Sequence, residues 1–283
     1  MNELLGFLFG IVSMLGFGIQ DAFMIKAART FGGFRTSFYI ILVVTLIMVP
    51  LGFFLFSFSG ITLAILLGLL AAAVLSATAL FSFNKGFHVG NPSIVATVAS
   101  ASGAVTAILS LIFFNQQLTA IQITAVALIV LGTILVSFKS GKLHLAKGHL
   151  GVGYAIIAMI GWGGFFFIIS WAVQSVGWFT AGLLVEAMTV VVYLIYSTVT
   201  KTQVFIESKH YPYLVMLGVL NMIAFLSYNL GVTYGYTFVV APVSAAAQVI
   251  VILFSLLVLK EGLSGNQKLG VLLALVGLIV IAL

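Results

Sequence analysis

Ten uninterrupted apolar stretches account for nearly the whole of this 283-residue chain. Each is close to the roughly 20 residues that a helix needs to cross the hydrocarbon core of a bilayer. A segment in lipid must pair its own backbone groups, so it forms a helix or part of a closed barrel, and continuous apolar runs lack the alternation of a barrel strand. The sequence therefore predicts an all-α integral membrane protein with ten transmembrane helices. They occupy residues 4–25, 37–57, 61–83, 92–114, 120–138, 149–171, 178–199, 212–233, 238–259 and 268–283.

The composition agrees with lipid as the solvent and excludes several classes of protein. Only 6% of the residues are charged, whereas a soluble domain carries about 25%. The chain has no cysteine, which excludes disulfides, and no basic run with interleaved aromatic residues that would indicate nucleic-acid binding. The first apolar stretch lacks the basic start and small-residue cleavage site of a signal peptide, so we expect a retained helix.

Two segments in different halves of the chain share a pattern. Residues 84–96 read NKGFHVGNPSIVA and residues 229–241 read NLGVTYGYTFVVA, with Asn, Gly, Gly, Val and Ala in the same order. The offset of 145 positions also relates Gly18 to Gly163, and it continues ungapped from the first helix to the last. A constant register across five helices predicts an internal duplication. The predicted units are a first repeat at 1–138, a basic cytoplasmic linker at 139–148 and a second repeat at 149–283.

An odd number of helices in each repeat predicts that the second repeat is inverted in the membrane. The loop charges agree, because Lys26, Arg29 and Arg35 have no basic counterpart in the matching loop WAVQSVGWFT. Conversely, Lys201 and Lys209 have none in the matching loop FSFSG. With ten spans, all 11 Lys and Arg residues fall on one side, which the positive-inside rule makes cytoplasmic. We expect the plasma or inner membrane of a prokaryotic cell, with both termini outside.

Short motifs resemble the EamA-like branch of the drug/metabolite transporter superfamily. They are MIGWGGFFFI at 159–168 and LLVLKEGLSGNQKLGVLLALVGLIVI at 256–281. The counterpart at 111–136 departs from the family pattern, with Gln116 in place of Glu and Ala125 in place of Gly. The resemblance implies a secondary active transporter, linked to protons or another gradient, that exports a small organic metabolite such as an amino acid or a related compound. It also implies a central cavity lined by the first, third, fourth, sixth, eighth and ninth helices, with the fifth and tenth at the periphery.

Ionisable residues inside a membrane are costly and are therefore candidates for function. Glu186 lies about a third of the way along its helix, where it could carry a proton or act as counter-ion to a cationic substrate. It could instead bond to a neighbouring helix or face a water-filled vestibule. Asp21 has the same possible roles, or it reaches water or Lys26 near the cytoplasmic end of the first helix.

Neutral polar and aromatic residues within the spans complete the predicted substrate site. The polar residues either contact substrate or bond between helices, and the aromatic ones could form a stacking wall or a cage for a cation. Trp162 lies mid-span among glycines, where interface anchoring does not explain it. The polar candidates are Gln20, Asn84, Ser100, Asn229 and Gln248, and the aromatic ones are Phe17, Trp162 and Tyr228.

Four glycines at the ends of the third and eighth predicted helices are candidate gating hinges. They are Gly86, Gly90, Gly231 and Gly235. Glycine in a transmembrane helix also serves close packing, so both roles remain open. Pro242, one turn inside the ninth helix, is expected to kink it.

Two other classes of function are alternatives to transport. An enzyme would need paired acids, a metal-ligating cluster or a nucleophile with its base. The four histidines lie in loops or at helix ends, and neither Asp21 nor Glu186 has an obvious partner acid, so no enzyme, metal site or cofactor is predicted. A passive channel or a lipid-handling subunit remains as the alternative. The predicted partners are a small-molecule substrate, protons and the lipid bilayer.

Overall fold

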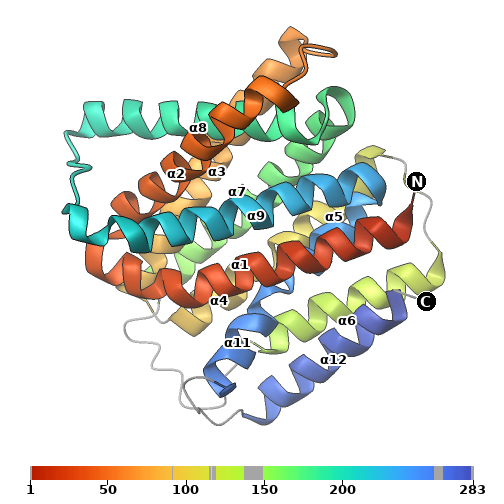
Figure 1. The fold of residues 1–283 in the computed structure, drawn as a ribbon. Helices are drawn as coiled ribbons and strands as arrows, with labels where there is room; N and C mark the ends of the chain where they lie inside the picture. Colours follow the sequence, from red (N-terminus) through yellow and green to blue (C-terminus); the bar gives the residue numbers. More distant parts are fainter. Residues whose placement is uncertain are drawn as a thin grey trace.

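The computed structural model is a bundle of helices, and it describes residues 2–90, 92–114, 116, 119–136, 149–257 and 264–281. The predicted linker at 139–148 lies outside these residues. Figure 1 shows the helices packed side by side, with the two chain ends at the same end of the bundle. The helices of the first half are α1 (Glu3–Phe31), α2 (Gly33–Leu55), α3 (Leu63–Val89), α4 (Pro92–Ser100), α5 (Ser102–Phe114) and α6 (Ala120–Val136). Those of the second half are α7 (His149–Val176), α8 (Trp178–Thr200), a short 3₁₀ turn η2 (Ser208–His210), α9 (Tyr211–Tyr234), α10 (Thr237–Ala245), α11 (Ala247–Leu257) and α12 (Gly265–Ile281).

These helices supply the ten predicted spans. In the described part of the chain, six helices (α1, α2, α3, α7, α8 and α9) are each long and apolar enough to cross a membrane. The other four spans are α6, α12 and two helices that are each divided in two, α4–α5 and α10–α11. The all-α fold with ten spans is thus confirmed, and the described part of two spans is divided, the fourth at Ala101 and the ninth at Ala246.

In the first repeat, two helices also extend beyond their predicted C-terminal ends. The apolar stretches end near residues 25 and 83, but α1 continues to Phe31 and α3 to Val89. Hydropathy marks the part of a helix that crosses hydrocarbon, while the backbone stays helical into the polar interface. Each helix stops at a glycine, Gly32 after α1 and Gly90 after α3.

Close glycine contacts show the same duplication in three dimensions. A Cβ placed on Gly6 would lie 2.5 Å from the Cα of Gly235, and one on Gly90 would lie 2.7 Å from the Cα of Gly151. The two contacts correspond, because Gly151 lies 145 positions after Gly6 and Gly235 lies 145 positions after Gly90. Because both contacts join α1 to α9 or α3 to α7, the halves pack together through equivalent helices.

Loops that correspond to one another lie at opposite ends of the bundle. At one end, the Nε of Arg35 at the start of α2 donates to the carbonyl of Gln203, between α8 and α9, at 3.0 Å. At the other, the backbone N–H of Ser57, between α2 and α3, donates to the hydroxyl of Thr180 at the start of α8, at 3.0 Å. The loop after α2 thus meets the junction of α7 and α8, and the loop after α8 meets the junction of α1 and α2. This is the arrangement of an inverted repeat.

Helices α6 and α12 pack against each other along one side of the bundle, at the lower right of Figure 1. A Cβ on Gly132 of α6 would lie 2.4 Å from the backbone nitrogen of Ala274, and one on Gly277 of α12 would lie 2.7 Å from the carbonyl oxygen of Ala125. Gly132 and Gly277 are again 145 residues apart. Glycine is therefore required for this helix–helix distance.

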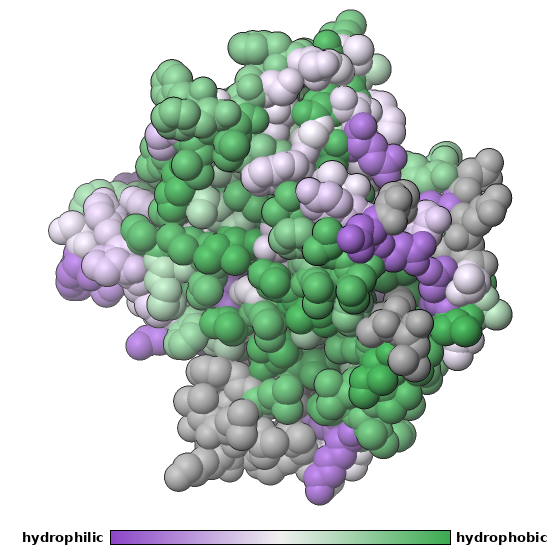
Figure 2. Space-filling model, turned by 45° about the vertical axis from the view of Figure 1, so that its right-hand side comes forward, coloured by the Kyte–Doolittle hydropathy of each residue, from purple (hydrophilic) through white to green (hydrophobic). Residues whose placement is uncertain are grey.

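The outer surface is suited to lipid. Figure 2 shows one face of the molecule, on which apolar side chains cover the middle and hydrophilic ones gather toward the margins. Many large apolar side chains are exposed; those of Phe53 and Phe54 on α2 are 89% and 88% exposed. Contiguous apolar surface on this scale is not found on water-soluble monomers, and a bilayer covers it.

Candidate substrate cavity

A cavity lies at the centre of the bundle, between the two repeats, with about 890 Å³ of empty space when the part open to the surroundings is included. Its lining comes from eight of the ten spans, and none of the described lining residues belongs to α6 or α12. The six helices implied by the resemblance all contribute, and α2 and α8 add Ile41 and Glu186. The lining residues are Phe17, Gln20, Asp21, Met24, Ile41, Ser76, Leu80, Phe83, Ala99, Ser100, Ser102, Gly103, Thr106, Trp162, Phe165, Phe166, Glu186, Asn221, Phe225, Tyr228, Ala241, Ser244, Ala245, Ala247 and Gln248.

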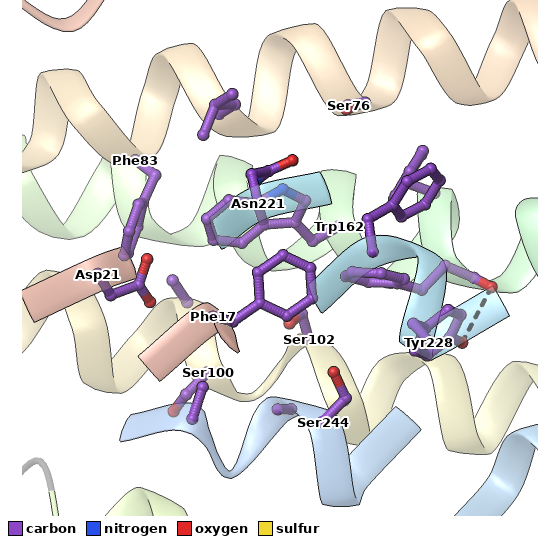
Figure 3. A pocket seen from close by; sticks show the side chains of 18 of the residues that line it. Phe17, Asp21, Ser76, Phe83, Ser100, Ser102, Trp162, Asn221, Tyr228 and Ser244 are labelled. Carbon is purple, nitrogen blue, oxygen red and sulfur yellow. Dashed lines mark hydrogen bonds between the residues drawn. The ribbon is translucent and has the colours of Figure 1, made fainter. Parts of the chain in front are cut away.

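Equivalent positions of the two repeats face each other across this cavity. Of the 25 lining residues, 22 form eleven pairs separated by 145 positions. Phe17 pairs with Trp162 in this way, and both lie near the middle of the view in Figure 3. The cavity is therefore built around the pseudo-twofold axis that relates the repeats.

Both divided helices break beside the cavity, and they break at equivalent residues. The N–H of Ala101 donates to the carbonyl of Val98 at 3.3 Å, and that of Ala246 donates to the carbonyl of Val243 at 3.2 Å. The predicted distortion near Pro242 is present, but the first repeat breaks equally with Thr97 at the corresponding position. Proline is thus not the common cause of the breaks.

Polar side chains of α1 bond across the cavity to the second repeat. The Nε2 of Gln248 donates to the Oδ2 of Asp21 at 3.4 Å, and the Nδ2 of Asn221 donates to the Oε1 of Gln20 at 3.1 Å. Figure 3 shows Asp21 below Phe83 and Asn221 to the right of Phe83 in the cavity. The structure therefore brings together Gln20, Asp21 and Gln248, three of the predicted site residues, and adds Asn221.

Glu186 is the second acidic residue of the lining. It lies on α8, is 3% exposed, and its Oε2 has no hydrogen-bond partner among the described residues. A buried polar atom without a partner requires an explanation such as a ligand or a proton. Within the described residues, no group of three or more His, Asp or Glu side chains gathers to hold a metal ion.

Aromatic rings form another part of the lining. Phe166 lies 4.5 Å from Tyr228 between ring centroids, and Phe83 lies 4.7 Å from Trp162. The hydroxyl of Tyr228 is 3.0 Å from that of Ser170, which does not line the cavity. Tyr228 thus presents its ring to the cavity. Phe17, Trp162 and Tyr228 were predicted; Phe83, Phe165, Phe166 and Phe225 were not.

The asparagines Asn84 and Asn229 lie outside the lining. The Nδ2 of Asn84 donates to the hydroxyl of Ser37 at 2.8 Å, which joins α3 to α2. The Nδ2 of Asn229 donates to the carbonyl of Trp178 at 3.1 Å, which joins α9 to α8. Both amides therefore bond between helices, which was the alternative to substrate contact.

The predicted hinge glycines also lie at close helix contacts. Gly90 and Gly235 follow the last residues of α3 and α9, against Gly151 and Gly6. Cβ atoms on Gly86 and Gly231 would lie 2.9 Å and 2.8 Å from methyl groups of valines that follow these helices. Close packing accounts for glycine at all four positions, and their role as hinges stays a prediction.

Five polar residues of the lining were not predicted: Ser76, Ser102, Thr106, Asn221 and Ser244. Helical spacing gives a signal for one of them, since Asn221 precedes Tyr228 by seven residues and so shares its helix face. Serine and threonine give no such signal, because their hydroxyls commonly donate to the backbone of their own helix whether or not that helix lines a cavity. Thr106, for example, donates to the carbonyl of Ser102 on its own helix at 3.2 Å.

Two corresponding helix contacts beside the cavity differ in extent. Helix α5 packs closely along α10, where a Cβ on Gly103 would lie 2.5 Å from the Cβ of Ala245. The counterpart of this contact is between α4 and α11, and the described residues of those helices meet only sparsely. The other helix pairs that line the cavity are more evenly matched. The scaffold is thus symmetric except where the divided helices meet.

Ten membrane spans in two inverted repeats, with a central cavity built from both, define the class of a membrane transporter. The model of the EamA-like transporter family matches residues 4–138 and 149–283, and the chain belongs to this family. No curated protein matches the chain. A solved structure titled "Crystal structure of protein" matches with a TM-score of 0.75 at 15% identity, covering 97% of this chain and 95% of that one. This likeness shows a shared fold. The family is one of transporters and not of enzymes.

Proposed function

We propose that this transporter exports a small organic metabolite, an amino acid or a related compound, by alternating access coupled to protons. One observation carries the proposal: the cavity is lined by equivalent positions of two inverted repeats. In such an arrangement one repeat can adopt the pose that the other has left, which exposes a midplane site to each side in turn. The outward direction and the amino-acid class rest on the family resemblance.

Glu186 is the proposed proton-coupling residue. Its buried Oε2 lacks a partner in the described structure, so the carboxyl is free to exchange a proton for substrate within the cycle. Asp21 is a weaker candidate because Gln248 already donates to its carboxylate. The residues of the lining, rather than Asn84 and Asn229, are proposed to contact the substrate.

The orientation in the membrane is part of the proposal. Lys26, Arg29 and Arg35 lie at the junction of α1 and α2, and this junction bonds to the segment that carries Lys201 and Lys209. The positive-inside rule assigns this end to the cytoplasm. Both termini then lie outside.

Flux into proteoliposomes tests this function. Purified protein is reconstituted, the vesicles are loaded with an unlabelled candidate, and uptake of the labelled compound is measured with and without a pH gradient. A transporter that works by alternating access gives saturable counterflow, and an imposed pH gradient drives accumulation. Flux that rises linearly with concentration and shows no counterflow would instead indicate the passive-channel alternative.

A further inference from the structure

The ionisable groups of the cavity are all of one sign. Asp21 and Glu186 line it, and no Lys, Arg or His is found among its described lining residues. A zwitterionic amino acid in this cavity would bring a carboxylate beside two acidic side chains, without a basic partner. The charge balance thus favours the amino group of a substrate over its carboxylate.

Glu186 provides the most direct place for an amino group. A carboxylate only accepts hydrogen bonds, and the buried Oε2 of Glu186 has no described donor. A protonated amine supplies both the donor and the opposite charge, and charge-assisted bonds are the stronger class. The counterpart of Glu186 in the first repeat is Ile41, so this anchor exists once, on one side of the cavity.

The aromatic part of the lining describes the rest of the ligand. Phe165 lies 5.8 Å from Phe225, and Phe166 lies 6.2 Å from Phe17, so the rings form a continuous group with Tyr228. Because the Tyr228 hydroxyl is beside Ser170, this group offers ring faces and edges. Such a wall accommodates an aromatic or bulky aliphatic body, and rings also stabilise a nearby cation.

We propose that the cavity selects a primary amine with an aromatic or bulky apolar body and without a free carboxylate, the amine being held by Glu186. The proposal rests on the transport function above and names its substrate class. A decarboxylated amino acid, or one whose carboxylate is an ester or amide, has this chemistry. Asp21 keeps its bond from Gln248 and adds negative potential without forming the principal contact.

A matched series of ligands tests the proposal, with the melting temperature of the detergent-purified protein as readout, because a ligand that binds the folded state raises it. The probes are 2-phenylethylamine, phenylalanine methyl ester, phenylalanine, 3-phenylpropionate and 2-phenylethanol, which share one body. We expect dose-dependent stabilisation by 2-phenylethylamine and phenylalanine methyl ester. We expect little stabilisation by phenylalanine, 3-phenylpropionate or 2-phenylethanol. Equal or stronger stabilisation by phenylalanine, 3-phenylpropionate or 2-phenylethanol would overturn it, as would no response to any of the five.

The variant Glu186→Gln tests the anchor. It keeps the size and shape of the side chain, and we expect it to weaken amine binding about thirtyfold or more, the scale for removing one partner of a buried charge pair. Glu207→Gln, at an exposed loop position, is the matched control and should bind as the wild type does. The comparison of amine with alcohol needs no variant and stands if Glu186→Gln does not fold. If amines bind but give no counterflow in proteoliposomes, the binding site stands and the transport function fails.

Discussion

Glu186 and Ile41 occupy corresponding positions in the two repeats, and only one of them carries a charge. The same is true of Asp21 and Phe166, which also face the cavity. Duplication has therefore kept the backbone frame while the chemistry of the two halves has diverged. Under the proposed function, we expect a substrate to meet acidic groups on one side and aromatic rings on the other, and therefore to bind in one orientation.

The variant Glu186→Gln should keep the fold and lose the pH dependence of transport. A glutamine amide neither binds nor releases a proton in the pH range of the transport measurement. Coupling of transport to protons therefore ends, even if substrate still enters the cavity. Flux in proteoliposomes across a series of pH values checks this. If the variant keeps the wild-type pH profile, Glu186 has no part in coupling.

Glu207→Gln is the control for that experiment. The Lys209 ammonium beside Glu207 holds the pKa of that carboxyl below its usual range. Because the pKa of Glu207 is lowered in the folded protein, its carboxyl is already ionised well below neutral pH. Its charge therefore does not change near neutral pH. Its replacement should leave the pH profile of flux unaltered.

Asn84→Ala should destabilise the protein without changing substrate affinity. The side chain is fully buried and its Nδ2 bonds to Ser37 and to the carbonyl of Leu80. Loss of such a bond between membrane helices costs roughly 0.5–2 kcal/mol. Melting temperature and KM measured together check this, and Asn221→Ala provides the contrast, since Asn221 lines the cavity and its loss should raise KM. An altered KM with unchanged stability in Asn84→Ala would return Asn84 to the binding site.

Residue type alone could not separate these asparagines. Asn84, Asn229 and Asn221 are all amides within apolar helices. Burying an amide costs much less free energy than burying a charge, so the presence of an amide in a helix does not indicate its role. The two carboxylates gave a stronger signal, because a charge in hydrocarbon has few tolerable positions. The sequence thus marks both carboxylates of the lining, but it does not separate Asn221, which lines the cavity, from Asn84 and Asn229, which do not.

At the scale of helices, the breaks at Ala101 and Ala246 are what hydropathy could not predict. The stretches 92–114 and 238–259 are apolar throughout, and an apolar pattern does not distinguish one helix from two that meet end to end. Pro242 drew attention to the second repeat only. The 145-residue offset of the duplication, by contrast, could be found from the glycines. Where two helices approach so closely that a Cβ does not fit, only glycine is tolerated, so both repeats have it.

Gly132→Ala should destabilise the contact between α6 and α12. The new Cβ would lie 2.4 Å from the backbone nitrogen of Ala274, which cannot move as a side chain does. Overpacking of this kind costs about 1–3 kcal/mol, so the melting temperature should fall. Ligand affinity should not change, since neither helix contributes to the described lining. Gly153→Ala is the control, because its Cβ would meet no atom of the described residues within 4 Å; equal melting temperatures for the two variants would contradict the prediction.

At the scale of the whole molecule, inversion makes a prediction about sidedness. The chain lacks cysteine, so single cysteines report on one position each. Exposed Ser59, between α2 and α3, and exposed Ser208, at the start of η2 between α8 and α9, lie at opposite ends of the bundle. In intact cells, Ser59→Cys should react with a membrane-impermeant thiol reagent and Ser208→Cys should react only after permeabilisation. The reverse pattern would invert the proposed orientation.

The uneven contacts of the divided helices make a prediction about the transport cycle. If the repeats exchange poses, the close α5–α10 contact opens while α4 and α11 come together, since these two contacts correspond. Gly103 allows the present contact, and its counterpart is the much larger Gln248. Gly103→Ala should push α5 from α10 and shift the population toward the other state.

A single reporter cysteine can detect that shift. Ser76 of α3 lines the cavity. A cysteine at this position, Ser76→Cys, has nearly the size and shape of serine. In the wild-type background it should be labelled mainly from the end that carries Lys26 and Arg35, because the α5–α10 contact lies toward the opposite end. Gly103→Ala should increase labelling from that opposite end, whereas Gly153→Ala should not. A ligand that binds only one state would then reverse or strengthen the shift by its differential affinity. Unchanged labelling in Gly103→Ala would mean that α5 and α10 stay together throughout the cycle.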